Sequence, residues 1–210
     1  MGGRFRVAFV RPVPPMPRLL LRSAAVALAF ATPAFASETV SKAQVLEAIR
    51  TFEANAVGSL AQSKSADQEG AAVAKASNII LKFAIESDDV VVDLGADAVP
   101  WCDVKKGLQE VSGAGQRGLL LAAYVCGSVR AQLQSGKQDP NPLAGWVAML
   151  RVYRAMRIRE GVEIPEVETL LARQANGSLE ASAAAALRRS RERLRKAYGA
   201  TDPPAAVPQP

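Results

Sequence analysis

The 210-residue sequence contains no histidine. Imidazole is the base of Ser-His-Asp and Cys-His catalysis, a ligand of common zinc and copper sites, and part of the c-type haem attachment motif. The sequence also lacks the Gly-x-Ser-x-Gly, P-loop, dinucleotide-fingerprint, EF-hand and Ser-x-x-Lys motifs. We therefore predict a protein without enzymatic activity, cofactor or metal site.

Acidic residues are absent before Glu38, whereas five arginines lie in that stretch. An apolar run over 24–30 follows, too short to span a bilayer, and Ala34-Phe35-Ala36 has the small-x-small pattern of a cleavage site. The pattern predicts a secretory signal peptide over 1–36, cleaved after Ala36, and a periplasmic or secreted protein. The alternative is a retained signal anchor, which would need a longer apolar core.

The positive charge of the chain lies largely in that signal. The chain has 26 basic and 20 acidic residues, and removing five arginines leaves 21 against 20, a net charge of +1. The excess of basic residues in the whole chain is therefore no evidence for a nucleic-acid partner, and we predict none. No later apolar run is long enough to span a bilayer, so we predict no transmembrane segment in the mature chain.

Aromatic residues make up only 5% of the chain, so alanine, leucine, valine and isoleucine must build the core. That composition favours an all-α domain over 37–199, a bundle of about seven helices, with an array of stacked helical hairpins as the alternative. The proline-rich segment 200–210 is predicted to be a disordered tail. Apolar spacing and start or stop residues place the helices at about 42–56, 67–86, 103–111, 116–134, 142–160, 165–176 and 178–198.

Four of these helices have clear features. Ser41 and Asp67 are candidate N-caps, and Asn141-Pro142 combines a capping residue with proline at the first helical position. Leu119 through Val125 contains no charge, which places helix 116–134 at the centre of the fold.

The segment 88–97 is not helical in pattern. Three consecutive valines (90–92) between aspartates predict a short extended segment, either a strand or a crossing. The carboxylates in and beside it are typical of helix caps and a solvated loop, with a calcium site as the less favoured alternative. These residues are Asp88, Asp89, Asp93, Asp97 and Asp103.

The chain has two cysteines, and an exported protein folds in an oxidising compartment. Cys102 and Cys126 lie symmetrically about Ala114, so two helices folding back at the glycine turn there would bring the sulfurs level. We predict a disulfide between them, which would stabilise the fold by about 3 kcal/mol. If the third helix began before Cys102, this side chain would point away from the apolar face, and the alternative is two buried, unreactive thiols.

Glu86-Ser87 follows a predicted helix and resembles the lysozyme-type lytic transglycosylases, which place a catalytic Glu before Ser. That family continues with Gly-Leu-Met-Gln a short way on. Here Gly118-Leu119-Leu120 is distant and the Met-Gln pair is missing. The resemblance implies a small-ligand-binding or cell-wall-active protein with a cleft near 86–103.

Arginines gather on two predicted helices. Those over 151–159 lie on helix 142–160, and a basic, weakly amphipathic helix ends the domain. Such a helix is typical of a solvated face, or of a surface that meets an anionic surface or an acidic protein. The leading functional prediction is therefore a non-enzymatic interaction module that binds a macromolecular partner through Arg188, Arg189, Arg191, Arg193, Arg195 and Lys196.

Overall fold

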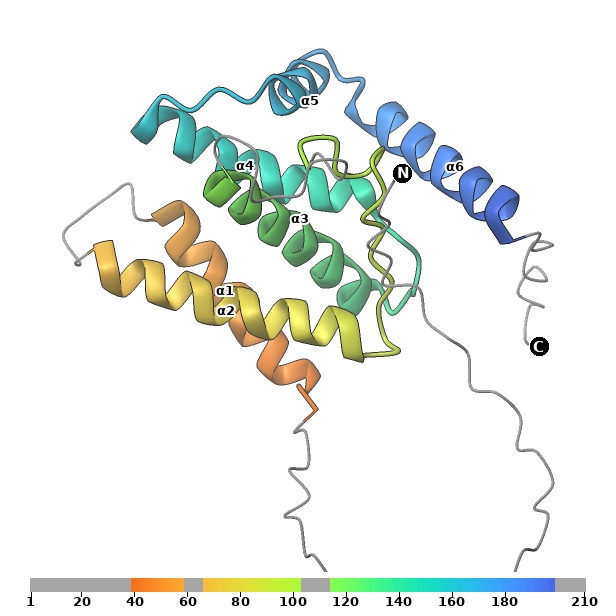
Figure 1. Cartoon of the computed structure of the whole chain (residues 1–210). Coiled ribbons are helices and arrows are strands. Elements are labelled where there is room, and N and C mark those ends of the chain that lie inside the picture. Colours follow the sequence, from red (N-terminus) through yellow and green to blue (C-terminus); the bar gives the residue numbers. More distant parts are fainter. Residues whose placement is uncertain (1–38, 59–65, 103–113, 199–210) are drawn as a thin grey trace, which may run out of the picture.

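The computed structural model describes residues 39–58, 66–102 and 114–198. Within these ranges the chain forms six helices and no strand, which confirms the all-α class. The expected helix over 103–111, the signal peptide (1–36) and the tail (200–210) lie outside the described residues. The helices are α1 (Lys42–Gly58), α2 (Ala66–Glu86), α3 (Ala114–Ser135), α4 (Pro142–Glu160), α5 (Pro165–Ala175) and α6 (Leu179–Tyr198), as Figure 1 shows.

Local capping explains where two of the helices begin. The Ser41 hydroxyl accepts a hydrogen bond from the Gln44 backbone N–H (3.2 Å), and the Gln44 side chain accepts one from the Ser41 N–H (2.8 Å), which makes a capping box. Asn141 caps α4 by accepting from the Ala144 N–H (3.0 Å). The prediction for α2 was wrong in detail: this helix begins at Ala66, so Asp67 lies within its first turn.

The helices pack in sequence order. α1 contacts α2, both contact α3, α3 packs along α4, and α4 carries α5 and α6 on its other side (Figure 1). Glycines on facing sides of the α3–α4 pair let the two backbones approach. A Cβ added to Gly127 would lie 2.5 Å from the Ala144 carbonyl oxygen, and one added to Gly145 would lie 2.4 Å from the Tyr124 ring. The central position predicted for helix 116–134 is confirmed, since Leu120 and residues 122–126 are buried.

The segment between α2 and residue 102 is a crossing and not a strand. The backbone of this segment is hydrogen-bonded to a side chain of α3. The buried Gln132 amide accepts from the Val91 N–H (2.8 Å) and donates to the Val91 carbonyl (2.9 Å). The Tyr124 hydroxyl donates to the Asp93 carbonyl (2.9 Å). The backbone groups of Val91 and the Asp93 carbonyl are thus hydrogen-bonded, while Val90 and neighbouring apolar residues fill the core.

Two tryptophans join the crossing to the central helices. The Trp146 indole of α4 donates to the Ala98 carbonyl (2.6 Å), and the Trp101 ring meets the Tyr124 ring edge to face with centroids 5.9 Å apart. Trp101 and Trp146 are almost fully buried. A chain poor in aromatic residues therefore places both of its tryptophans at one junction.

The predicted disulfide is absent: Cys102 and Cys126 are both buried and unbonded. Trp101, the neighbour of Cys102, packs on Tyr124. Cys126 is two residues further along α3, which turns it by about 200° from Tyr124. The prediction assumed two helices joined at the glycine turn, but residue 102 lies in the crossing segment, which approaches α3 from the Tyr124 side.

The surroundings of the thiols agree with this separation. Burial, opposed by the Arg117 guanidinium, raises the pKa of Cys102 to about 11. Burial, and then the Glu53 carboxylate of α1, raise the pKa of Cys126 to about 12. The charged groups that act on the two thiols are therefore different, and the alternative of two buried thiols describes the structure.

Among the described residues no helix is both long enough and apolar enough to cross a bilayer.

Candidate interaction surface on the C-terminal helix

The part of α6 that packs against the body of the protein is short, and most of its buried side chains are small. Gly177 adopts a left-handed conformation (φ 76°) at the end of α5, and the Ser178 N–H bonds back to the Arg173 carbonyl (2.9 Å), so the chain reverses into α6. The buried side chains of α6 then recur at steps of four, three and four residues and face the body of the protein. They are Leu179, Ala183, Ala186 and Ser190.

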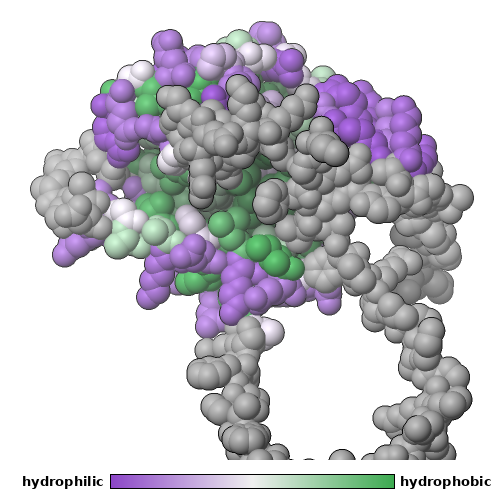
Figure 2. Space-filling model, viewed as in Figure 1, coloured by the Kyte–Doolittle hydropathy of each residue, from purple (hydrophilic) through white to green (hydrophobic). Residues whose placement is uncertain are grey.

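Between Arg191 and Lys196 the helix is exposed all round. Every residue from Arg191 to Lys196 is exposed, including Leu194 at 41%. In Figure 1 this end of α6 extends past the other helices, and in Figure 2 hydrophilic surface gathers over α6 at the upper right. Arg195 and Lys196 lie in the last turn, where positive charge offsets the helix dipole.

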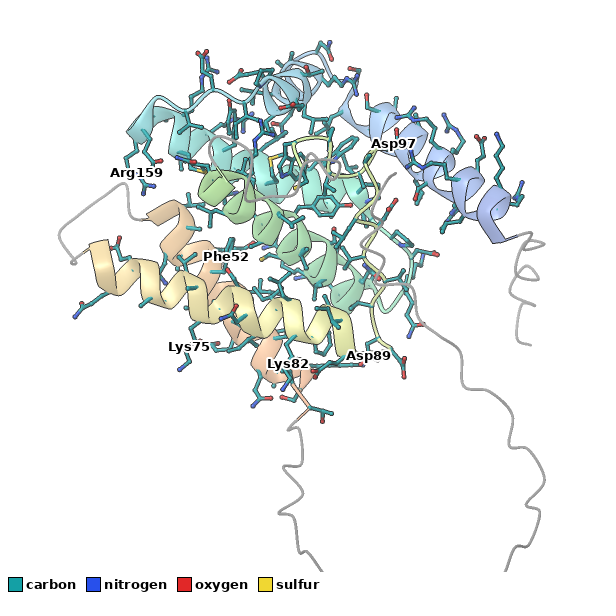
Figure 3. All side chains as sticks on the ribbon, viewed as in Figure 1. Phe52, Lys75, Lys82, Asp89, Asp97 and Arg159 are labelled. Atoms are coloured by element: carbon teal, nitrogen blue, oxygen red, sulfur yellow. The ribbon has the colours of Figure 1, made fainter. Side chains whose placement is uncertain are left out.

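Asp97, on the crossing segment, joins α6 to the rest of the fold. Its carboxylate accepts from Arg189 Nε (2.8 Å) through Oδ1 and contacts Arg193 Nη1 through Oδ2. The Asp97 side chain is only 19% exposed, whereas the two arginines are about half exposed. Gly95 leaves room for this contact, because a Cβ there would lie 3.3 Å from Arg193 Nη2. Figure 3 labels Asp97 next to α6.

Five of the six predicted interaction residues therefore fall into two groups, and the sixth, Lys196, is exposed in the last turn. Arg189 and Arg193 lie on one side of α6 and are occupied by Asp97. At about 100° per residue, Arg188, Arg191 and Arg195 fall within an arc of about 60° on the other side. All three are exposed. We call these three residues the arginine stripe.

The arginines of α4 lie in a different setting, because several of them contact side chains nearby. Arg154 Nη2 donates to Gln174 of α5 (2.7 Å), and Arg157 Nη1 pairs with Glu168 of α5 (3.2 Å). Arg159 Nε donates to the adjacent Glu160 (2.8 Å). The first two contacts tie α4 to α5, and the third lies within α4.

Three carboxylates of the alternative calcium site contact separate partners. Asp89 pairs with Lys42 Nζ (2.9 Å), Asp93 accepts from the Gly95 N–H (2.8 Å), and Asp97 binds α6. In the described ranges no three acidic or cysteine side chains come together as metal ligands. Asp103 lies outside those ranges.

Glu86 is at the C-terminal end of α2, where it faces Lys82 at 3.9 Å. It lines a shallow pocket of about 250 Å³ together with residues 39–42, Phe83, Ser87 and Asp89. The volume is just below the range of about 300–1,000 Å³ that is usual for small-molecule sites. The pocket touches the start of the cleft expected near 86–103, but its other wall comes from the beginning of α1.

The chain matches no protein-family model, no curated protein and no solved structure.

Proposed function

We propose that the protein is exported, loses residues 1–36, and acts as a non-enzymatic binding module that attaches to an anionic macromolecular partner through α6. The single observation that carries this proposal is the arginine stripe, three exposed arginines on one side of a helix that is exposed all round from Arg191 to Lys196. A mature chain of nearly balanced charge has no general attraction for anions, so the local stripe would decide where the partner binds.

Asp97 supports the same proposal from the other side of the helix. By binding Arg189 and Arg193 it fixes the rotation of α6 and keeps the stripe turned away from the body of the protein. A rigid helix loses less conformational freedom on binding than a flexible basic tail would lose.

Affinity recovery from an unfractionated cell-envelope extract tests this function, with recovered protein and lipid phosphate both measured. The bait is the chain from residue 37, and the variant is R188Q/R191Q/R195Q, since glutamine keeps helix propensity. The matched control, R50Q/R151Q/R154Q, removes the same charge from exposed positions on α1 and α4. We expect recovery by the wild type and the control and its loss with the stripe variant. Equal recovery by the stripe variant would contradict the proposal.

Export has its own test, because the mass of the protein isolated from the cell reports where it is cut. We expect a mature chain that begins at Ser37. An uncut chain in the cytoplasm would contradict both the signal peptide and the periplasmic or secreted location.

The second candidate is a small-ligand-binding or cell-wall-active protein, supported by the pocket that Glu86 lines. A zymogram with cell-wall material compares the native chain with Glu86→Gln. Clearing by the native protein alone would support this candidate, and equal clearing by both, or none by either, would end the Glu86 hypothesis.

A further inference from the structure

We propose that Asn176, in the turn between α5 and α6, is a site of spontaneous modification at which asparagine becomes aspartate or isoaspartate. The Gly177 nitrogen attacks Asn176 Cγ and closes a five-membered imide, and its proton leaves with the side-chain amide as ammonia. Water then opens the imide at either of its two carbonyl carbons, so both products carry a carboxylate. The reaction consumes only water, and the inference does not depend on the function proposed for α6.

Asn176 is the one asparagine of the chain that precedes a glycine. The chain has four asparagines, and the residues after the other three are alanine, isoleucine and proline. A proline nitrogen has no proton to lose, and the side chains of alanine and isoleucine crowd the attacking nitrogen. Asn176 and Gly177 are both exposed, and nothing lies within 4 Å of a Cβ added to Gly177. Water therefore has access to the reacting atoms.

The side-chain amide of Asn176 is held in a way that favours attack. Its oxygen Oδ1 accepts hydrogen bonds from the Ser178 N–H (3.1 Å) and from the Ser178 hydroxyl (2.6 Å). Donors to a carbonyl oxygen stabilise the negative charge that develops on it when a nucleophile adds to the carbon. In the described part of the chain no hydrogen bond involves the Asn176 side-chain nitrogen, so no protein contact opposes its departure.

The peptide plane between Asn176 and Gly177 has to turn before the reaction. Asn176 has ψ 7°, which places the Gly177 nitrogen beside Asn176's own nitrogen and away from Cγ. Turning the plane breaks the bond from the Gly177 N–H to the Gln174 carbonyl, which is long at 3.3 Å. It also moves Gly177 away from φ 76°, and glycine tolerates positive and negative φ alike. The folded turn therefore slows the reaction and does not prevent it.

The two products differ in their effect on α6. Isoaspartate adds a carbon atom to the backbone, because the chain then runs through the former side chain. The Ser178 N–H bonds back to the Arg173 carbonyl (2.9 Å) across this turn, and the turn directs the chain into α6. A longer backbone displaces Ser178, so α6 should be held less firmly against Asp97. Aspartate keeps the backbone length and should leave α6 in place.

Timed incubation of the chain from residue 37 in warm neutral buffer tests the chemistry. Peptide mass spectrometry measures the replacement of –NH2 by –OH at each asparagine. Asn78 is the internal control, because it is exposed on α2 and precedes isoleucine. We expect a mixture of aspartate and isoaspartate at Asn176, and conversion at Asn78 that is at least several-fold slower. No conversion at Asn176, or equal rates at the two positions, would overturn the inference.

Three variants examine the individual groups. Asn176→Gln lengthens the side chain by a methylene and should stop conversion at this position. Gly177→Ala and Ser178→Ala should each slow conversion several-fold, the first by hindering the peptide rotation and the second by removing the hydroxyl donor. Wild-type rates in both would overturn the roles of these groups. Circular dichroism melts identify any variant that has lost the fold, and the comparison with Asn78 in the wild-type chain needs no variant.

The effect on α6 is measured by amide exchange on the separated isoaspartate form. Asn176→Asp is the matched control, since it carries the same charge without the added backbone atom. We expect faster exchange in α6 of the isoaspartate form, wild-type exchange in α6 of the control, and unchanged protection of α3 in both. Equal exchange in α6 of all three proteins would overturn the proposed effect on this helix.

Discussion

The close approach of α3 and α4 can be tested by adding one methyl group to Gly127. In Gly127→Ala the new Cβ would lie 2.5 Å from the Ala144 carbonyl oxygen, 3.1 Å from its carbonyl carbon and 2.6 Å from the Ala148 Cβ. Two of these atoms belong to the α4 backbone, so the clash cannot be relieved by turning a side chain. Relief requires that the helices separate by about an ångström, which opens gaps along their buried contact.

The magnitude follows from two opposing effects. Alanine is a better helix former than glycine by about 1 kcal/mol, whereas overpacking a close-packed core costs about 1–3 kcal/mol and occasionally more. Because the obstacle is backbone, we expect the overpacking to be at the high end and the net loss to be about 2 kcal/mol. For a chain of this size that corresponds to a Tm lower by roughly 4–8 °C.

Gly118→Ala is the matched control on the same helix. Nothing lies within 4 Å of the Cβ that it would add, so only the gain in helix propensity applies. We expect this variant to be more stable by about 0.5–1 kcal/mol. Urea unfolding of both variants, followed by circular dichroism at 222 nm as the usual helix signal, measures the difference. Equal stabilisation by the two substitutions would refute the packing of α3 against α4 at Gly127.

Three further predictions concern the crossing segment and the thiols. Gln132→Leu removes both hydrogen bonds to the Val91 backbone and leaves its polar groups without partners, so the free energy of unfolding should fall by about 2–3 kcal/mol in urea titrations; an unchanged midpoint would contradict the contact. Asp97→Asn removes the carboxylate charge that holds α6, and amide exchange should accelerate in α6 while α3 keeps its protection; uniform exchange behaviour would show that Asp97 is not the anchor. Cys102 and Cys126 should react with a thiol reagent only after unfolding, and the absence of free thiols in denaturant would restore the disulfide. In the folded protein the pKa values of Cys102 and Cys126 are raised to about 11 and 12. As pH rises above about 9, the unfolded chain therefore loses the thiol protons before the folded chain does. The contribution of the two thiols to stability is present below pH 9 and declines between pH 9 and 12.

Structural features that depend on residues within one helical turn could be predicted from the sequence. Asn141-Pro142 and the stop at Gly161 give the bounds of α4, because capping and left-handed termination depend on adjacent residues. The run Leu119 to Val125 likewise identified the helix with the most buried middle. Ser41 was recognised as a cap, and its reciprocal partner Gln44, three residues on, could have been recognised by the same spacing.

Contacts between residues far apart in the sequence could not be predicted in this way. Asp97 and Arg189 are 92 positions apart, and Val91 and Gln132 are 41 apart. A glutamine in a helix has the same local pattern whether its amide meets water or a buried backbone. The disulfide prediction failed for the same reason, because the spacing of the two cysteines about Ala114 does not reveal that the crossing segment meets α3 on the Tyr124 side.

For the candidate site, the sequence predicted a basic last helix but not the division of its charges. Six basic residues look equivalent in sequence, and only the position of Asp97 distinguishes Arg189 and Arg193 from the arginine stripe. The rotation of α6 follows from its contacts with α4 and with Asp97, and residues 179–198 alone do not determine these contacts.

The central claim is that a partner lies against the arginine stripe, and photo-crosslinking in the producing cell tests it most directly. A photoreactive residue is placed at position 191 in the stripe or, as the control, at the exposed position 151 on α4. We predict adducts with the partner from position 191 and none from position 151. No adduct from position 191, or equal adducts from both positions, would contradict the account.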